Sequence, residues 1–230
     1  MPLPSQREVA HRDRSRFRVL TVCTGNICRS PQAAMLLSQR LGAAFVGSDA
    51  TRQLSVESAG TLGFDGSPMD APALTEARRL GIAHPEVHRA RRIQPAYVER
   101  ADLILGMSRE HRGAAASLLP SANRRAFALV EFARIVEVLA ARELESQVAP
   151  LGAEGFASFM HGVVEAAGRM RGVVPALARR EDYDIIDPYR LQASVYRESA
   201  DAVAAWTART VDALVSLAAQ SRPSPTNHGI

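Results

Sequence analysis

A cysteine, an arginine and a group of turn-forming residues lie close together near the start of this chain. The segment from Cys23 to Ser30 reads C-T-G-N-I-C-R-S, and it joins a β-rich apolar run to an apolar helical pattern that opens with Ser-Pro. Backbone amides at the start of a helix attract anions, and Gly25 and Asn26 can adopt left-handed angles that turn further amides inward. A thiolate at the base of such a loop is a nucleophile, and the planar guanidinium of Arg29 matches two phosphate oxygens. The segment therefore predicts a phosphate-binding loop from Cys23 to Arg29, with Cys23 as the nucleophile.

Two other interpretations of these residues stay open on the pattern alone. A cysteine after a buried strand is commonly just a small core residue, and the C-x5-R spacing is short. Two cysteines at this spacing could also bind a metal. No second Cys or His pair stands at ligand spacing, however, so we expect no metal and no cofactor. The Gly-Asn pair, the Ser-Pro pair and the flanking strand and helix favour the phosphate-binding loop.

The elements that must position this loop alternate between strand and helix. Short apolar runs are followed by stretches of helical period, and residues 103–105 are continuously apolar, as in strands covered on both faces. The alternation predicts an α/β doubly wound fold, with a mainly four-stranded parallel sheet and helices on both faces. We expect strands at 17–22, 54–58, 101–107 and 125–130, and helices that begin at 30–31, 73, 108–109 and 194.

The segment 133–182 differs from the rest because it is Ala-rich and helical in period. We expect two or three helices here, as a helical insertion before the extended run that ends in Asp187-Pro188. One apolar face comprises Phe156, Phe159, Met160, Val163, Val164 and Met170. A helix hairpin cannot bury such a face alone, so the face must pack on the core, on a partner or on a second subunit. Because the segment ends just before Asp187, we predict that it forms a helical lid or a dimer surface near the site that selects substrate. The polar segments 1–16 and 221–230 are expected to be flexible tails.

Composition excludes several classes of protein. The chain has 230 residues, a formal net charge of +4 and two cysteines, and its 28 basic residues are all arginines. It shows no disulfide framework, no signal-peptide-like apolar start and no uninterrupted apolar run long enough to cross a membrane. Its basic residues are not interleaved with aromatic residues, as they are in proteins that bind single strands. We therefore expect a cytoplasmic protein that binds neither nucleic acid nor a membrane.

The stretch V-C-T-G-N-I-C-R-S-P at 22–31 resembles the signature loop of the low-molecular-weight protein tyrosine phosphatases. Further matches follow in the family's order: S-A-G-T at 58–61, G-S-P-M-D at 66–70, G-I at 81–82, H-R-A-R at 88–91 and D-P-Y at 187–189. The resemblance covers 17–132 and 183–219, which implies a phosphatase domain at 17–220 interrupted by the insertion at 133–182. It also implies a bacterial phosphomonoester hydrolase, specifically a protein-tyrosine-phosphatase.

The resemblance implies a role for each residue of the site. Cys23 would form a phosphocysteine intermediate, Arg29 and the loop amides would hold the phosphate oxygens, and Ser30 would hydrogen-bond the thiolate. Asp187 would protonate the leaving group and then activate the water that cleaves the intermediate. Asn26 would hold the loop in its shape. The phosphate-binding loop would comprise Thr24, Gly25, Asn26, Ile27, Cys28 and Ser30.

Several other residues have two interpretations. Asp182 and Asp184 are the nearest rivals of the predicted acid. Phe64 and Tyr189 could form the walls of a substrate pocket that grips a phosphotyrosine ring, or they could be ordinary semi-buried packing. His88 is expected to be a structural hydrogen-bonding residue. The implied partners are a phosphotyrosine protein or aryl phosphate, a phosphate or other oxyanion in the loop, and a second copy of the chain in a homodimer.

Departures from the family's pattern leave the substrate open. Thr24 stands where the family often has a larger apolar residue, and Arg190 stands where animal members carry a second tyrosine. One rival function is an arsenate reductase of the same fold, but the thioredoxin-coupled kind needs further cysteines outside the loop, and this chain has none. The other rival function is a non-catalytic phosphate-binding scaffold. Every predicted catalytic position is intact, which argues against it.

Overall fold

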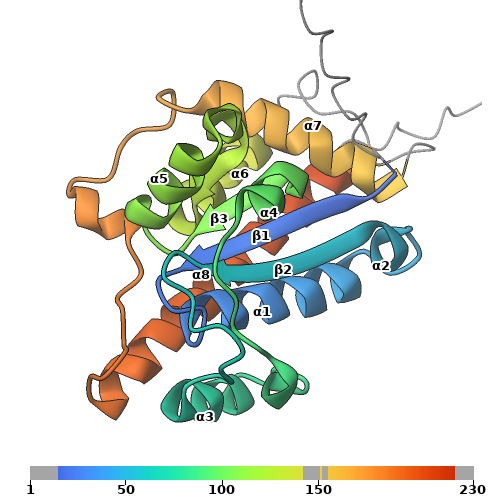
Figure 1. Cartoon of the computed structure of the whole chain (residues 1–230). Coiled ribbons are helices and arrows are strands. Elements are labelled where there is room, and N and C mark those ends of the chain that lie inside the picture. The colour runs from blue at the N-terminus through green and yellow to red at the C-terminus, as the bar shows by residue number, and fades with distance from the viewer. Residues whose placement is uncertain (1–14, 142–150, 152–154, 221–230) are drawn as a thin grey trace, which may run out of the picture.

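Four short apolar segments form one parallel sheet in the computed structural model, which describes residues 15–141, 151 and 155–220 (Figure 1). The strands are β1 (Phe17–Cys23), β2 (Leu54–Gly60), β3 (Leu103–Gly106) and β4 (Ala126–Ala128), in the order β2-β1-β3-β4. The central strand β1 pairs in parallel with β2 along its whole length and with β3 on its other side. This arrangement confirms the predicted four-stranded parallel sheet.

Helices cover both faces of the sheet. Successive β1 side chains point to opposite faces, so each face carries apolar side chains that helices bury. Val19 packs in the larger core with α1 (Arg29–Ala44), α6 (Leu129–Ala141) and α8 (Ala193–Gln220), whereas Leu20 packs on the other face with α4 (Pro95–Arg100) and α5 (Arg109–Leu118). The doubly wound prediction is therefore confirmed. The other α-helices are α2 (Ala50–Gln53), α3 (Ala71–Arg79) and α7 (Gly155–Met170).

The fourth strand is shorter than the sequence predicts. We expected a strand over 125–130, but β4 ends at Ala128 and helix α6 begins at Leu129. An unbroken apolar run does not distinguish a buried strand from a buried helix. The helix start is set by Glu131, whose carboxylate accepts the Ala128 backbone N–H at 3.1 Å, as in a capping box. The helical segment thus begins at 129 rather than at 133.

The apolar face of α7 packs on the chain's own core. The Phe156 and Phe159 rings lie 5.1 and 6.1 Å from the Phe45 ring, and His161 lies edge-on to Phe17 at 5.2 Å. Phe17 opens β1, so α7 lies at the amino ends of the strands, opposite the end that carries the predicted loop. Of the three places predicted for this face, the core is therefore the one that it takes, and the face forms no lid over the site. A dimer surface elsewhere on the segment stays a prediction.

Helix α8 is long and apolar enough, by length and composition alone, to cross a membrane. Half of its apolar window is nevertheless buried inside the protein, where it packs on α1 and α6. Arg40 of α1 adds a hydrogen bond to Thr207 Oγ1 at 2.7 Å. These contacts are those of a core helix. Apart from residues 15 and 16, the predicted tails at 1–16 and 221–230 lie outside the described residues.

Candidate active site at the carboxyl end of the central strand

The predicted loop joins the end of β1 to the start of α1. Cys23 is the last residue of the strand, and Arg29 is the first residue of the helix. The loop passes so close to the end of β2 that a Cβ atom on Gly60 would lie 2.5 Å from the Thr24 carbonyl oxygen. A side chain there would force the loop away, so the close approach requires glycine. The carboxyl edge of a parallel sheet is where such folds bind ligands.

Asn26 holds the shape of the loop from its centre. Its φ of 59° is left-handed, which asparagine tolerates better than most residues. Its buried amide donates to Ser30 Oγ and to Ser58 Oγ, both at 2.9 Å, and its Oδ1 accepts the Arg91 backbone N–H at 2.9 Å. Every polar atom of the side chain is thus engaged, and the strained backbone is fixed in one conformation.

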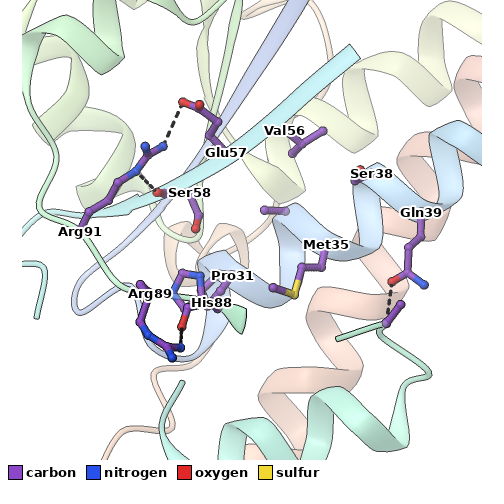
Figure 2. Close-up of a pocket in the computed structure, with 12 residues that line it drawn as sticks. Pro31, Met35, Ser38, Gln39, Val56, Glu57, Ser58, His88, Arg89 and Arg91 are labelled. Atoms are coloured by element: carbon purple, nitrogen blue, oxygen red, sulfur yellow. Dashed lines mark hydrogen bonds and ion pairs between the residues drawn. The ribbon is translucent and has the colours of Figure 1, made fainter. Parts of the chain in front are cut away.

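Residues from β2 and from the segment after α3 contact the loop, and Figure 2 shows the side chains of Glu57, Ser58, His88 and Arg91. His88 Nε2 lies 2.7 Å from the Asn26 carbonyl oxygen, so this nitrogen carries the proton and donates. Burial lowers the pKa of His88, which keeps the ring neutral at pH 7. Arg91 Nε donates to the Ser58 carbonyl at 2.9 Å, and its Nη2 pairs with Glu57 at 3.0 Å. The hydrogen bond from His88 to the Asn26 carbonyl is the structural role expected for this histidine.

The thiol of Cys23 faces a hydroxyl group. Cys23 is 2% exposed, and its Sγ lies 3.0 Å from Ser30 Oγ. Ser30 Oγ accepts a hydrogen bond from the Asn26 amide, and it can donate its one proton to the Cys23 sulfur at 3.0 Å or to the Ala59 carbonyl at 3.4 Å. The sulfur thus lies beside a hydroxyl group, near the amino end of α1.

Arg29 links the loop to the segment before α8. The guanidinium is buried, donates from Nη1 to the Ile185 carbonyl at 2.9 Å, and pairs through Nη2 with Asp187. Within the described residues its Nε has no hydrogen-bond partner. A buried N–H without an acceptor is costly, and an oxyanion in the loop would supply one.

Asp187 is the carboxylate that reaches the loop. It pairs with Arg29, and its Oδ2 also lies 3.4 Å from Thr24 Oγ1. The two rival carboxylates are held elsewhere: Asp184 pairs with Arg109 at 2.9 Å, and Asp182 pairs with Arg179 at 2.7 Å. Of these three carboxylates, Asp187 is thus the one that contacts the loop, in the place that the resemblance implies for the acid.

Two aromatic rings form one side of the opening. The Phe64 and Tyr189 ring centroids lie 5.7 Å apart, and both rings line a cavity of about 50 Å³. The cavity is also lined by Cys23, Thr24, Gly25, Ile27, Cys28, Arg29 and Asp187. Phe64 lies so close to the loop that a Cβ atom on Gly25 would be 2.8 Å from its ring. The structure thus brings together the residues predicted for the loop, the acid and the aromatic walls.

His111 lies beside this site, although the sequence of the chain did not indicate it. The buried ring, on the first turn of α5, lies 3.0 Å from Thr24 Oγ1 through Nε2 and 2.7 Å from Ser108 Oγ through Nδ1. Burial, reinforced by the positive charge of Arg29, lowers the pKa of His111 to about 4. The neutral ring therefore ties Thr24 to α5 at pH 7. A histidine 87 positions from its partner leaves no local pattern that could reveal this contact.

The comparisons with known proteins agree with this geometry. The profile of the family described as "Low molecular weight phosphotyrosine protein phosphatase" matches residues 18–145, more than half of the chain. The chain belongs to this family. The prediction made from the signature loop is therefore confirmed.

Individual relatives place the chain among bacterial members. It is 38% identical over 113 residues to the "Probable low molecular weight protein-tyrosine-phosphatase EpsP" of Ralstonia solanacearum, covering 49% of this chain and 70% of that protein. It is 30% identical over 116 residues to the "Protein-arginine-phosphatase" of Geobacillus stearothermophilus, covering 50% of this chain and 71% of that protein. The solved structure of Vibrio vulnificus Wzb in complex with benzylphosphonate matches with a TM-score of 0.55 at 20% identity, over 86% of this chain and 98% of that one. At that identity the structure supports the fold.

Proposed function

We propose that this chain hydrolyses phosphomonoesters through a phosphocysteine intermediate and that its substrates are phosphotyrosine proteins or related aryl phosphates. The observation that carries the proposal is the convergence of Cys23, Arg29 and Asp187 on one small cavity. They come from the end of β1, the start of α1 and the segment before α8, so only the folded chain brings a nucleophile, an oxyanion holder and an acid together.

In the first step the Cys23 thiolate attacks phosphorus. The new S–P bond forms as the P–O bond to the leaving group breaks, and protonated Asp187 gives its proton to the leaving oxygen. Arg29 and the loop amides hold the other phosphate oxygens, with the unpartnered Arg29 Nε as one donor. The arriving oxyanion competes with Asp187 for Arg29, which frees the carboxyl group for proton transfer.

In the second step a water molecule attacks the phosphorus of the phosphocysteine. The Asp187 carboxylate takes a proton from this water, the S–P bond breaks, and the electron pair returns to the Cys23 sulfur. Ser30 Oγ, 3.0 Å from that sulfur, donates its proton as a hydrogen bond to the departing thiolate. Inorganic phosphate then leaves, and the acid is protonated again for the next cycle.

The walls of the cavity favour an aromatic leaving group. Phe64, Tyr189 and Ile27 offer apolar contacts that suit a phenyl ring. A phosphoarginine would instead bring a guanidinium group, which needs carboxylates or other acceptors, and Asp187 is the one carboxylate in the lining. A phenolate is also a poor leaving group without protonation, because the tyrosine pKa is about 10. These features support phosphotyrosine over phosphoarginine.

The test compares substrates and variants in one assay. The proposal expects hydrolysis of an aryl phosphate and of phosphotyrosine peptides, with much lower kcat/KM for matched phosphoarginine peptides. Cys23→Ser is expected to lose turnover but still bind vanadate or phosphate, since the loop remains. Faster hydrolysis of phosphoarginine would favour the activity named for the Geobacillus relative. Arsenate reduction without phosphatase activity, or oxyanion binding with no turnover at all, would favour the two rival functions.

A further inference from the structure

A second cavity, of about 240 Å³, lies between α5, α6 and the chain that follows α7. Its lining includes four arginines and one carboxylate: Arg109, Arg112, Arg134, Arg171 and Glu131. Most of these residues belong to the helical segment between β4 and the acid loop. Of the five, Arg171 lies beyond residues 18–145, which the family profile matches, so the cavity joins this matched part to the chain after α7.

The charges around this cavity do not balance. Arg171 pairs with Glu131 at 3.1 Å, and Arg109 pairs with Asp184 at 2.9 Å. Four arginines less these two carboxylates leave two positive charges, on Arg112 and Arg134. Across the described part of the chain, neither of these two arginines has a carboxylate partner, so the cavity is a positively charged site that suits an anion.

Neutral groups hold the two uncompensated arginines in place. Arg112 donates from Nε to the Ala126 carbonyl at 3.2 Å, and Arg134 donates to the Tyr183 hydroxyl at 3.3 Å and the Pro175 carbonyl at 3.1 Å. Such contacts orient a guanidinium without neutralising it. Burial lowers the pKa of neighbouring Arg171; Glu131 raises it, and the repulsion from the charge of Arg112 lowers it further. An anion bound between them would relieve this repulsion.

One short segment connects the cavity to the active site. Tyr183 lines the cavity, Asp184 accepts the Arg109 backbone N–H at 2.7 Å, and Asp187 lines the catalytic pocket. Four residues of extended chain span at most about 14 Å. The chain between α7 and α8 runs past the end of the sheet to which β1 points (Figure 1). A peptide seated in the active site could therefore reach the cavity with a residue about four positions away.

We propose that this cavity binds an anionic side chain of the protein substrate, a carboxylate or a second phosphate, about four positions from the phosphotyrosine. The inference rests on the proposed function and adds a substrate preference to it. Arg112 and Arg134 supply the charge, and Arg109 couples the cavity to the acid loop through Asp184. Small aryl phosphates do not reach the cavity and would be indifferent to it.

The experiment compares phosphotyrosine peptides that carry glutamates three to five positions from the phosphotyrosine with peptides that carry glutamines instead. Wild-type protein is expected to show a kcat/KM roughly two- to five-fold higher for the acidic peptide, which is the scale of partly exposed ion pairs. The preference should shrink as the ionic strength rises to about 0.5 M, because salt screens exposed charges. Arg112→Gln/Arg134→Gln should bring the ratio near one and leave aryl phosphate hydrolysis unchanged.

Two matched variants keep the test sharp. Arg112→Lys/Arg134→Lys also removes both guanidinium groups but retains the charge, so it should retain the preference. It thereby separates loss of charge from loss of the guanidinium contacts. Arg52→Gln/Arg209→Gln removes two exposed arginines from α2 and α8 and should leave the ratio unchanged. Equal hydrolysis of both peptides by the wild type, or an unchanged ratio in the folded glutamine variant, would overturn the proposal.

Binding to Cys23→Ser protein separates this proposal from the proposed function, because it needs no turnover. Tighter binding of the acidic peptide without any hydrolysis by the wild type would refute the function and retain the cavity site. Hydrolysis of both peptides, with no difference in their binding, would refute the cavity site alone.

Discussion

Replacing Asn26 tests whether its side chain, or only its backbone angle, organises the loop. Asn26→Ala removes three hydrogen bonds, to Ser30, to Ser58 and from the Arg91 amide. At a net contribution of about 1 kcal/mol each, their loss lowers the free energy of unfolding by about 3 kcal/mol. Alanine at φ 59° adds about 1 kcal/mol of strain, for a total of about 4 kcal/mol.

Asn26→Gly is the matched control because glycine adopts the left-handed angle freely but makes none of the hydrogen bonds. We expect it to lose about 3 kcal/mol, and we expect both variants to lose most of their activity. Urea unfolding gives the two free energies, and aryl phosphate hydrolysis gives kcat. Wild-type kcat in Asn26→Gly would refute the reasoning, since the backbone angle alone would then suffice. A loss below about 1 kcal/mol in Asn26→Ala would show that the hydrogen bonds contribute little.

Three further predictions follow from the site. Asp187→Asn should slow hydrolysis of poor leaving groups by about 10²–10⁴-fold and good ones far less, measured over a series of aryl phosphates; equal slowing throughout would exclude a general acid. Because the His111 pKa falls to about 4 on folding from about 6.5, the unfolded state binds more protons between these values, and stability falls as the pH drops from 6.5 to 4. Urea unfolding against pH should show that His111→Gln loses up to about 3 kcal/mol of this dependence; an unchanged dependence in the variant would contradict the reasoning. Peroxide should produce a reversible disulfide between Cys23 and Cys28; mass spectrometry that finds an unrecoverable sulfonic acid on Cys23 instead would contradict this.

The sheet and the loop could be predicted because their signals are local. In the apolar run before Cys23, side chains pack alternately in the cores on the two faces of the sheet. The Gly-Asn turn and the Ser-Pro helix start follow directly in the sequence. Of the two turn residues, Asn26 has the left-handed angle, whereas Gly25 is needed for its closeness to Phe64. The residue types were thus predicted, and their separate physical reasons came from the structure.

The packing of the helical segment could not be predicted in the same way. The apolar face of α7 has the same period whether it covers a partner, a site or the chain's own core. The contact of Phe156 with Phe45, which is far away in the sequence, shows that this face packs on the chain's own core. The same limit applies to the contact between His111 and Thr24, because it depends on partners that the fold brings together. Asp187 could be predicted, since the D-P-Y stretch that it opens resembles the acid loop of the family.

The central claim is that Cys23 carries the phosphoryl group during turnover. Rapid acid quenching of the enzyme with an aryl phosphate, followed by mass spectrometry of its peptides, tests this directly. The account predicts one phosphoryl group on the Cys23 sulfur, present within the first turnover and more abundant in Asp187→Asn protein. Steady hydrolysis with no phosphoryl group on Cys23 at any quench time, or undiminished turnover by Cys23→Ser, would contradict it.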